Sequence, residues 1–267
     1  MELVKKIGIL DSGVGGLSLL ADLLNRDLAA EFYYISDSEN VPYGGKSQEF
    51  MLERTIKMVK ALESCGIKTI LIACNTLTTK TIRELRLRFS WLNFIGIEPY
   101  IKYGFNQKIA SDEHIGMILT EATYHSERFK SLRQEFDPQQ SIKVIALKGL
   151  AMAIESLSTK NLDQVLPVIK NELLPLNKFN FTHLILGCTH YPLIKSYIED
   201  SLKLVTIDPH IYVVQRLIEL EELKQGPKPG RHFWYNPNLS TNWEHTQQKD
   251  LYLFENLNII NAKGEIK

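Results

Sequence analysis

The sequence predicts an α/β protein made of two similar units, each built around a parallel sheet. Two features of its 267 residues carry this prediction. Apolar, β-branched stretches of strand length alternate with longer segments of helical apolar spacing, which is typical of βαβ units. In addition, two of the strands end in closely similar motifs that each contain a cysteine. We expect helices on both faces of the sheets, because parallel strands are usually buried on both sides.

Seven segments have the length and composition of buried strands. They run from Lys6 to Leu10, Phe32 to Ser36, Thr69 to Ala73, Ile115 to Leu119, Lys143 to Leu147, His183 to Leu186 and Leu204 to Ile207. The clearest helical spacing lies in Phe50 to Leu62 and in Val213 to Leu223. Gln225 to Gly230 is rich in glycine and proline, like a linker, so we expect the residues after it to form a tail.

The two similar motifs are Ile70 to Thr76 and Leu184 to His190. Each has an aliphatic strand, a small residue, a cysteine and a short polar run. In open parallel sheets, ligands bind beyond the carboxyl ends of the strands, and both cysteines follow such an end. The motifs therefore predict two related units that each present a thiol at this edge.

Composition narrows the class of protein. Hydrophobic residues make up 44% of the chain, which is enough for a sizeable core. Lys plus Arg and Asp plus Glu both number 31, so the chain lacks the charge signature of a protein that binds nucleic acid or an anionic membrane. The first apolar run, Ile7 to Leu10, is too short for a signal peptide or a membrane span. We therefore expect a cytoplasmic protein without nucleic-acid or membrane partners.

The chain has three cysteines, Cys65, Cys74 and Cys188, and this odd number predicts free thiols rather than a disulfide framework. Cys74 and Cys188 are expected at strand-to-helix turns, where a helix N-terminus favours the thiolate. Cys65 precedes Gly66 near a predicted helix end, and we interpret it as structural. A single buried cysteine is usually a small hydrophobic residue, but two in matching contexts favour acid–base chemistry.

Other polar residues follow the strand ends and complete a candidate site. They are Asp11 and Ser12, Tyr43 and Gly44, Asn75 and Thr76, Thr120 and Thr123, and Thr189 and His190. Hydroxyl and amide groups among them can donate hydrogen bonds to a carboxylate, so an anionic amino acid would fit. Asp11 and His190 can orient a thiol, shift its pKa or bind a substrate ammonium group. The residues alone leave open that Asp11 caps a turn and that His190 only packs.

Two other kinds of site have weaker support. The glycine-rich turn from Asp11 to Gly16 lacks the Lys-Ser/Thr of a phosphate-binding P-loop and the register of a dinucleotide-binding loop. It predicts instead a tight turn with close backbone approach. Cys188 and His190 could donate two metal ligands, but no second pair at zinc spacing accompanies them, so we predict no metal site.

Taken together, four segments resemble the signature motifs of the glutamate racemase family. They are Gly8 to Ser18, Asp37 with Pro42 to Gly44, Ala73 to Thr76, and Leu186 to Leu193, and the resemblance extends from about residue 7 to about residue 209. It implies two α/β units related by a pseudo-twofold, with the active site in the cleft between them. The first unit would hold residues 1–97 plus 210–267, and the second would hold residues 98–209.

The resemblance also implies racemisation without a cofactor, in which one thiolate removes the α-proton and the other cysteine, as a thiol, protonates the opposite face. Cys74 would deprotonate D-glutamate with the help of Asp11, and Cys188 would deprotonate L-glutamate with the help of His190. Glu155 matches an acidic residue that assists this histidine. The residues that would hold the substrate are Asp11, Ser12, Tyr43, Gly44, Asn75, Thr76, Thr120, Thr123 and Thr189. The D-glutamate would supply peptidoglycan synthesis, and the protein would be a homodimer.

The chain departs from the family pattern at several places, among them Asn40 and the segment from Gly230 to Lys267, and alternatives remain open. Lys148-Gly149 stands where the family commonly has Cys-Pro, and Leu77 is bulkier than the residue usual there. Aspartate racemases share the two-cysteine plan, but their second motif typically ends in Glu, so His190 favours glutamate over aspartate or another small acidic amino acid. A non-catalytic ligand-binding protein on the same scaffold is the remaining alternative. The two cysteines together with Asp11 and His190 favour an enzyme.

Overall fold

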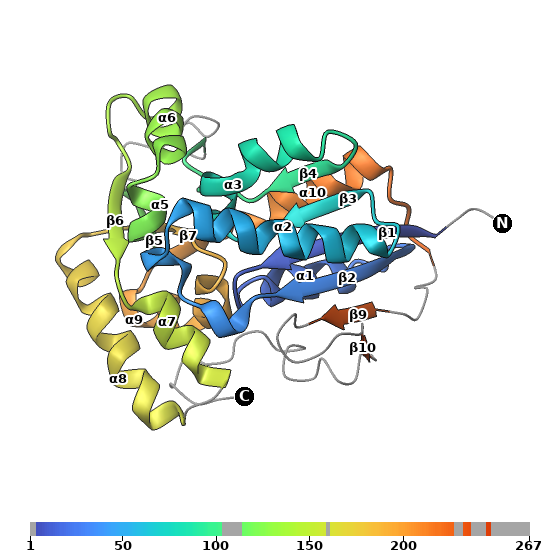
Figure 1. Ribbon diagram of the computed structural model, residues 1–267. Helices are drawn as coiled ribbons and strands as arrows, with labels where there is room; N and C mark the ends of the chain where they lie inside the picture. Colours follow the sequence, from blue (N-terminus) through green and yellow to red (C-terminus); the bar gives the residue numbers. More distant parts are fainter. Residues whose placement is uncertain (1–3, 103–113, 159–160, 227–231, 236–243, 247–267) are drawn as a thin grey trace.

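The computed structural model describes residues 4–102, 114–158, 161–226, 232–235 and 244–246. Within these residues the chain forms two β-sheets covered by helices, so the predicted α/β class is confirmed. In Figure 1 the strands β1 to β4 lie in one half of the molecule, and β5 to β7 lie in the other.

The first sheet has six strands among the described residues, in the order β10-β9-β2-β1-β3-β4. Their bounds are β1 Lys5–Asp11, β2 Ala30–Ser36, β3 Thr69–Ile72, β4 Asn93–Gly96, β9 His232–Tyr235 and β10 Glu244–Thr246. β9 pairs with β2 in parallel, and β10 pairs with β9 in the antiparallel sense. The prediction of a simple tail after Gly230 is therefore wrong. These two short strands find their partners only in the folded sheet, where the edge of β2 offers unpaired backbone groups.

The second sheet has four described strands, all parallel: β5 Ile115–Thr120, β6 Lys143–Leu147, β7 His183–Gly187 and β8 Val205–Ile207. Their order, β6-β5-β7-β8, repeats the order β2-β1-β3-β4 of the first sheet. In each set the third strand along the chain, β3 or β7, leads into a cysteine. The repeated topology confirms the prediction of two similar units and is the arrangement that a pseudo-twofold relation requires.

Four α-helices cover the first sheet: α1 Leu17–Leu24, α2 Gln48–Ser64, α3 Asn75–Arg88 and α10 His210–Glu221. Successive strand residues point to opposite faces. Accordingly, Ile9 packs with α1 and α10, whereas Leu10 packs with α2 and α3. The predicted helix Phe50 to Leu62 lies within α2, and the predicted helix Val213 to Leu223 corresponds to α10, which starts and ends earlier in the chain.

The second sheet is covered in the same way by α5 Glu121–Tyr124, α6 Glu127–Phe136, α7 Leu150–Glu155, α8 Leu162–Leu173 and α9 Lys195–Leu202. One face, which includes Leu184 and Leu186, packs with α7, α8 and α9. The opposite face, which includes Met117 and Ile185, packs with α6. Short 3-10 helices are η1 Ser38–Asn40, η2 Tyr43–Gly45, η3 Ser156–Ser158, η4 Leu174–Lys178 and η5 Tyr191–Ile194.

Local side chains set several helix ends. The hydroxyl of Ser47 accepts the backbone N–H of Phe50 at 3.2 Å at the start of α2, and that of Ser126 accepts the N–H of Phe129 at 3.1 Å at the start of α6. Past the end of α2, Gly66 has φ +77°, a left-handed conformation that glycine adopts without strain. Cys65, just before it, caps the helix, which agrees with its interpretation as structural.

The predicted strand positions agree closely with the observed ones, and Lys143 to Leu147 has the predicted bounds. The short strand β4 was not predicted from the sequence. The division of the chain into residues 1–97 plus 210–267 and residues 98–209 stays a prediction. Within the described ranges, the structure contains no helix long and apolar enough to cross a membrane.

Candidate active site

A cavity of about 230 Å³ lies between the carboxyl ends of the two sets of strands. Its lining includes eight of the predicted site residues: Ser12, Tyr43, Gly44, Cys74, Thr76, Thr120, Cys188 and His190. The other predicted residues, Asp11, Asn75, Thr123, Thr189 and Glu155, are buried and do not line the cavity. The lining comes from both sheets, and the cavity lies where the sequence predicted the site between the two units.

Cys74 follows β3 and caps α3, as predicted, with its sulfur accepting the backbone N–H of Leu77 at 3.5 Å. Its Sγ also lies 3.4 Å from Ser12 Oγ. Burial and the nearby charge of Asp11 raise the pKa of the Cys74 thiol to about 12, although the contacts with Ser12 and Leu77 lower it. The helix N-terminus does favour the thiolate of Cys74 through the N–H of Leu77, but desolvation outweighs this hydrogen bond, so the net pKa is raised.

Asp11 is the last residue of β1 and is fully buried. Its Oδ2 accepts the backbone N–H of Gly16 at 2.7 Å and that of Gly13 at 3.3 Å, so this residue does cap the turn. Its Oδ1 is buried with no hydrogen-bond partner in the described part of the chain. Burial raises the pKa of Asp11 from 3.8 to about 6, against the lowering effect of the charge on His190. Asp11 is therefore both a structural cap and a perturbed acid beside Cys74.

Cys188, His190 and Glu155 form a chain of contacts on the opposite side of the cavity. His190 Nδ1 lies 3.7 Å from the sulfur of Cys188, and His190 Nε2 lies 2.7 Å from Glu155 Oε2. Burial lowers the pKa of His190, but its contacts with Cys188 and Glu155 together raise this pKa by more. The net pKa of His190 is therefore well above the ordinary value. The direction of this shift favours the protonated ring, which lies between the sulfur of Cys188 and the carboxyl group of Glu155.

The backbone around Cys188 differs from the prediction. The residue is followed by the 3-10 helix η5, which begins at Tyr191, rather than by the first turn of an α-helix. A short 3-10 helix has a smaller dipole to offer a thiolate than an α-helix of several turns. The positive charge near Cys188 comes instead from the side chain of His190.

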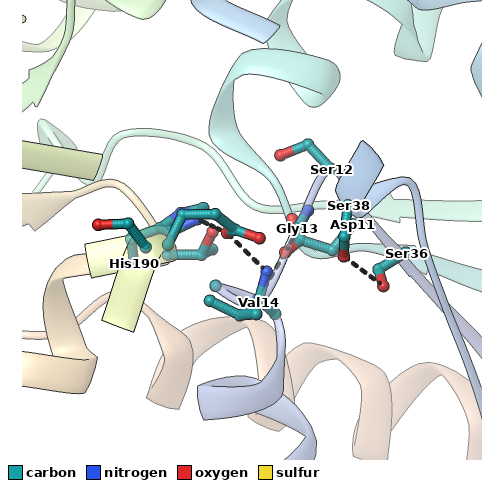
Figure 2. Close-up of polar contacts among 12 residues, drawn as sticks. Asp11, Ser12, Gly13, Val14, Ser36, Ser38 and His190 are labelled. Carbon is teal, nitrogen blue, oxygen red and sulfur yellow. Dashed lines mark hydrogen bonds and ion pairs between the residues drawn. The ribbon is translucent and has the colours of Figure 1, made fainter. Parts of the chain in front are cut away.

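The glycine-rich turn after β1 packs directly on the Cys188 side of the site, as Figure 2 shows for Gly13, Val14 and His190. The backbone N–H of Val14 donates to Glu155 Oε2 at 2.9 Å. A Cβ on Gly13 would overlap the Glu155 carboxylate, and a Cβ on Gly15 would lie 2.6 Å from His190 Nδ1. The predicted tight turn with close approach is confirmed, and the close approach is to the other half of the active site.

Three threonine hydroxyls meet where α3 and α5 begin. Thr76 Oγ1 lies 3.1 Å from Thr120 Oγ1 and 3.2 Å from Thr123 Oγ1, and Thr120 lies 3.0 Å from Thr123. Thr120 also caps α5 by accepting the N–H of Thr123 at 3.3 Å. Beside them, both polar atoms of the Asn75 side chain are buried without a hydrogen-bond partner among the described residues. This corner can rearrange its hydrogen bonds toward a polar ligand.

Tyr43 is held in the cavity wall by a buried acid. Its hydroxyl donates to Asp37, which also accepts from Arg54 Nε at 2.8 Å and from Asn40 Nδ2 at 2.9 Å. Although burial raises the pKa of Asp37, the hydrogen bonds from Arg54 and Tyr43 lower it more, so its pKa lies below the ordinary value. Asp37 is therefore a carboxylate that fixes the turn carrying Tyr43 and Gly44.

The sequence reasoning missed several lining residues. They are Val41, Pro42, Gly45, Glu121, Ala122, Leu147, Lys148, Ala151 and Met152. Lys148 is the only lysine or arginine among the described residues that line this cavity, and its Nζ lies 3.9 Å from Glu121 Oε1. Both residues directly follow strands, β6 and β5, so the rule that ligands bind at strand ends could have identified them. Arg54 lies within α2, away from any strand end, so this rule could not have identified it.

In the part of the chain that the structure describes, no group of three or more His, Cys, Asp or Glu side chains is arranged to hold a metal ion. Apart from Lys148 and Glu121, the charged or titratable groups described in the site are the two thiols, His190 with Glu155, Asp11 and Tyr43.

Comparison with known proteins bears on what this site does. The chain matches the family model described as Asp/Glu/Hydantoin racemase over residues 22–217. The glutamate racemase of Aliarcobacter butzleri is 32% identical over 257 residues, which are 94% of this chain and 95% of that relative. The glutamate racemase of Fusobacterium nucleatum is 32% identical over 256 residues, with the same two shares. A solved glutamate racemase of Bacillus anthracis is 29% identical, with a TM-score of 0.72 over 87% of this chain and 88% of that one.

Proposed function

This chain belongs to the Asp/Glu/Hydantoin racemase family, and we propose that it interconverts L- and D-glutamate by two-base catalysis with Cys74 and Cys188. The observation that carries the proposal is the presence of both thiols in the lining of one small cavity. They follow equivalent strands of two similar sheets, so they approach a bound molecule from different units. The relatives named glutamate racemase support the choice of glutamate.

The proposed reaction moves one proton off the α-carbon and another onto it. A thiolate takes the α-proton, and the electron pair of the broken C–H bond is delocalised into the substrate carboxylate. The opposite thiol then gives its proton to the other face of the α-carbon, which inverts the centre. The α-proton is very weakly acidic, so hydrogen-bond donors around the carboxylate must stabilise the developing charge. Protons and electrons balance between the two cysteines without an external oxidant or reductant, and we propose a reaction without pyridoxal phosphate.

The two thiols take different roles in this proposal. The raised pKa of Cys74, about 12, keeps it a thiol that can donate a proton. Cys188 is proposed as the base, because its sulfur lies 3.7 Å from Nδ1 of His190, whose pKa is raised well above the ordinary value. Cys188 as base and Cys74 as acid is the arrangement that acts on L-glutamate in the assignment implied by the family resemblance. Asp11 supports this arrangement, because its charge raises the pKa of Cys74 and so disfavours a thiolate there.

The substrate is proposed to lie against the hydroxyl groups of Ser12, Thr76 and Thr120, all of which line the cavity. Tyr43 and Gly44 would hold it from the side of the turn after β2. The unpartnered amide of Asn75 supports a role as a further donor, because a ligand that turns this side chain would satisfy it. We assign Asp11, Thr123 and Thr189 to the same binding corner, behind the residues in direct contact.

The test is to incubate L- and D-glutamate separately in deuterated water with the wild type and with Cys74→Ser and Cys188→Ser. We expect the wild type to racemise both enantiomers and to exchange the α-proton, and each variant to lose racemisation by several orders of magnitude. Cys65→Ser is the matched control, because Cys65 lies at the end of α2 outside the cavity, and it should retain full activity.

Two outcomes would contradict the proposal. A folded wild type that inverts neither enantiomer would exclude glutamate, and parallel assays with aspartate would then test the nearest alternative. Full racemisation by either serine variant would exclude the two-thiol mechanism. A visible chromophore that borohydride bleaches would reveal pyridoxal phosphate and exclude the cofactor-independent mechanism.

Three wider proposals follow from the same function. We propose that the D-glutamate produced supplies peptidoglycan synthesis, that the protein acts in the cytoplasm, and that it works as a homodimer. Deletion of the gene should create a requirement for D-glutamate that the Cys74→Ser gene does not relieve. Sedimentation equilibrium of the purified chain gives the oligomeric state directly, and a monomer would overturn the third proposal.

A further inference from the structure

Ser18, in the first turn of α1, contacts three different segments through one hydroxyl. Ser18 Oγ lies 2.7 Å from the carbonyl oxygen of Gly15, 3.2 Å from that of Thr189 and 3.3 Å from Nδ1 of His210. Ser18, Thr189 and His210 are all buried. Neither Ser18 nor His210 lines the cavity, so any effect of these residues on a bound molecule passes through the residues they contact.

The directions of these hydrogen bonds follow from the donor inventory. A serine hydroxyl has one proton, and a backbone carbonyl only accepts, so Ser18 shares that proton between the carbonyl oxygens of Gly15 and Thr189 in a three-centre hydrogen bond. It can then accept only from His210, which must carry its proton on Nδ1. Asp208 supports this tautomer, because its Oδ1 lies 3.5 Å from the same nitrogen and accepts the backbone N–H of His210 at 3.0 Å. His210 Nε2 is buried and has no partner among the described residues, so Nδ1 makes the only side-chain contacts of the ring found there.

The carbonyl of Thr189 belongs to the peptide that joins Thr189 to His190, directly after Cys188. Holding this peptide therefore restricts the positions of His190, which is part of it, and of Cys188, one residue before Thr189, whose Nδ1 and Sγ atoms lie 3.7 Å apart. The same turn packs on Gly15, where an added Cβ would lie 2.7 Å from Thr189 Oγ1. The Ser18 hydroxyl thus links the turn that contains Thr189 to the glycine-rich turn that contains Gly15.

We propose that Ser18 and His210 are positioning residues for the Cys188–His190 half of the reaction. This inference rests on the proposed racemase function. Cys74 is held separately, by Ser12 and by the N–H of Leu77, and neither of those contacts involves Ser18 or His210. Loss of the Ser18 contact should therefore slow proton transfer at Cys188 and leave proton transfer at Cys74 nearly unchanged.

The test compares Ser18→Ala and His210→Leu with His210→Asn, whose side-chain amide can take the place of Nδ1. Initial rates are measured in both directions with glutamate carrying hydrogen or deuterium at the α-carbon. We expect kcat to fall by about tenfold to a hundredfold in the first two variants, the range for a misplaced catalytic group. The deuterium isotope effect should rise with L-glutamate, because Cys188 then limits the rate, and fall toward unity with D-glutamate. His210→Asn should restore both values.

A purely structural role predicts a different result. Loss of folded protein lowers the rates in both directions by the same factor and leaves both isotope effects at the wild-type values. Thr55→Val is the matched control, because Thr55 is also buried and donates to the carbonyl of Met51 at 2.6 Å within α2. Its isotope effects should not change.

Unchanged isotope effects in Ser18→Ala would overturn the inference, whatever happens to kcat. If that variant does not fold, His210→Leu carries the same test. Failure of the proposed function looks different, because then the folded wild type itself does not racemise glutamate.

Discussion

His190 Nε2 lies 2.7 Å from Glu155 Oε2, and the same carboxylate oxygen accepts the backbone N–H of Val14. One buried acid therefore joins the histidine beside Cys188 to the glycine-rich turn that follows β1. Gly13 makes this possible, because a side chain there would overlap the carboxylate. The contact links the electrostatics of the Cys188 side to the packing between the two halves of the molecule.

The first prediction concerns this pair. Glu155→Gln keeps a hydrogen-bond acceptor for Val14 but removes the negative charge. Because Glu155 raises the pKa of His190, its loss should lower that pKa, and the imidazolium should disappear at a lower pH. We expect kcat at pH 8 to fall by about tenfold or more, with the alkaline limb of the pH–rate profile moved to lower pH. NMR titration of His190 measures the shift directly.

Glu199→Gln is the control for Glu155→Gln, because Glu199 also accepts a backbone N–H, that of Thr206 at 3.0 Å, and does not line the cavity. Its profile should match the wild type. An unchanged alkaline limb in Glu155→Gln would show that Glu155 does not control the protonation of His190.

The second prediction is that Asp11→Asn stabilises the protein while it lowers activity. Since burial raises the pKa of Asp11 from 3.8 to about 6, folding penalises the carboxylate. The penalty is full above pH 6 and absent below pH 3.8, where the side chain is protonated in both states. At pH 8 it amounts to about 3 kcal/mol as an upper bound, and at pH 5 to about half of that.

Urea unfolding of the wild type and Asp11→Asn at the two pH values measures this difference. The free energy of unfolding of the variant should exceed that of the wild type by more at pH 8 than at pH 5. A gain of the same size at both pH values would mean that it comes from packing rather than from the buried charge.

The third prediction concerns Arg54, which pairs with Asp37 behind Tyr43. Arg54→Met leaves the buried carboxylate with Tyr43 and Asn40, and should lower the free energy of unfolding by about 3 kcal/mol at pH 7. In the wild type the pKa of Asp37 is lowered, so the ionised side chain contributes to the free energy of unfolding. This contribution is present above pH 3.8 and is lost as the pH falls through the pKa of the folded state. Without Arg54, burial of Asp37 should outweigh its remaining hydrogen bonds and raise its pKa. The loss in free energy of unfolding caused by Arg54→Met should therefore be smaller in acid.

Chemical unfolding at pH 7 and pH 4 tests this sign, and the KM for glutamate should also rise because Tyr43 lines the cavity. Arg26→Met is the control, since it breaks a more exposed pair with Asp22, which is expected to contribute under about 1 kcal/mol. If Arg54→Met instead lost more free energy of unfolding at pH 4 than at pH 7, burial would not raise the pKa of Asp37 in the variant.

The fourth prediction is that Lys148→Met raises the KM for glutamate by about two- to fivefold and leaves kcat nearly unchanged. The reason is that Lys148 is the only lysine or arginine among the described residues of the cavity wall, while the substrate carries two carboxylates. Its side chain is 82% exposed, so added salt should weaken the effect. Lys57→Met, which breaks an exposed pair with Glu53, is the control. Equal KM values for the Lys148 variant and the wild type at low salt would exclude the role.

Much of the fold follows from local patterns. Buried parallel strands need continuous β-branched and aliphatic residues, so strands such as β1, β3 and β7 are visible in the sequence. The repeated motif around Cys74 and Cys188 also predicts two similar units, which the common strand order confirms. By contrast, β4 and β9 are only short segments, and β9 lies beside a strand distant in sequence, so no local pattern identifies them.

The site divides in the same way. Residues directly after a strand could be predicted, since the topology of a parallel sheet brings such positions to one edge. Arg54 and His210 could not, because each lies on a helix and meets its partner only through packing. The protonation state of Cys74 was also beyond the sequence. A helix N-terminus is readable from the motif, whereas the depth of burial that raises the thiol pKa is a property of the whole fold.

The sequence by itself determined the α/β class, the two similar units and the two cysteines at equivalent strand ends, because these depend on residue type and on the order of elements along the chain. Only the tertiary structure decided that Glu155 reaches His190 through the gap left by Gly13, and that Ser18 ties the Cys188 turn to the opposite half. The physical reason is that hydrogen-bond distance and desolvation depend on how segments far apart in the sequence pack against one another.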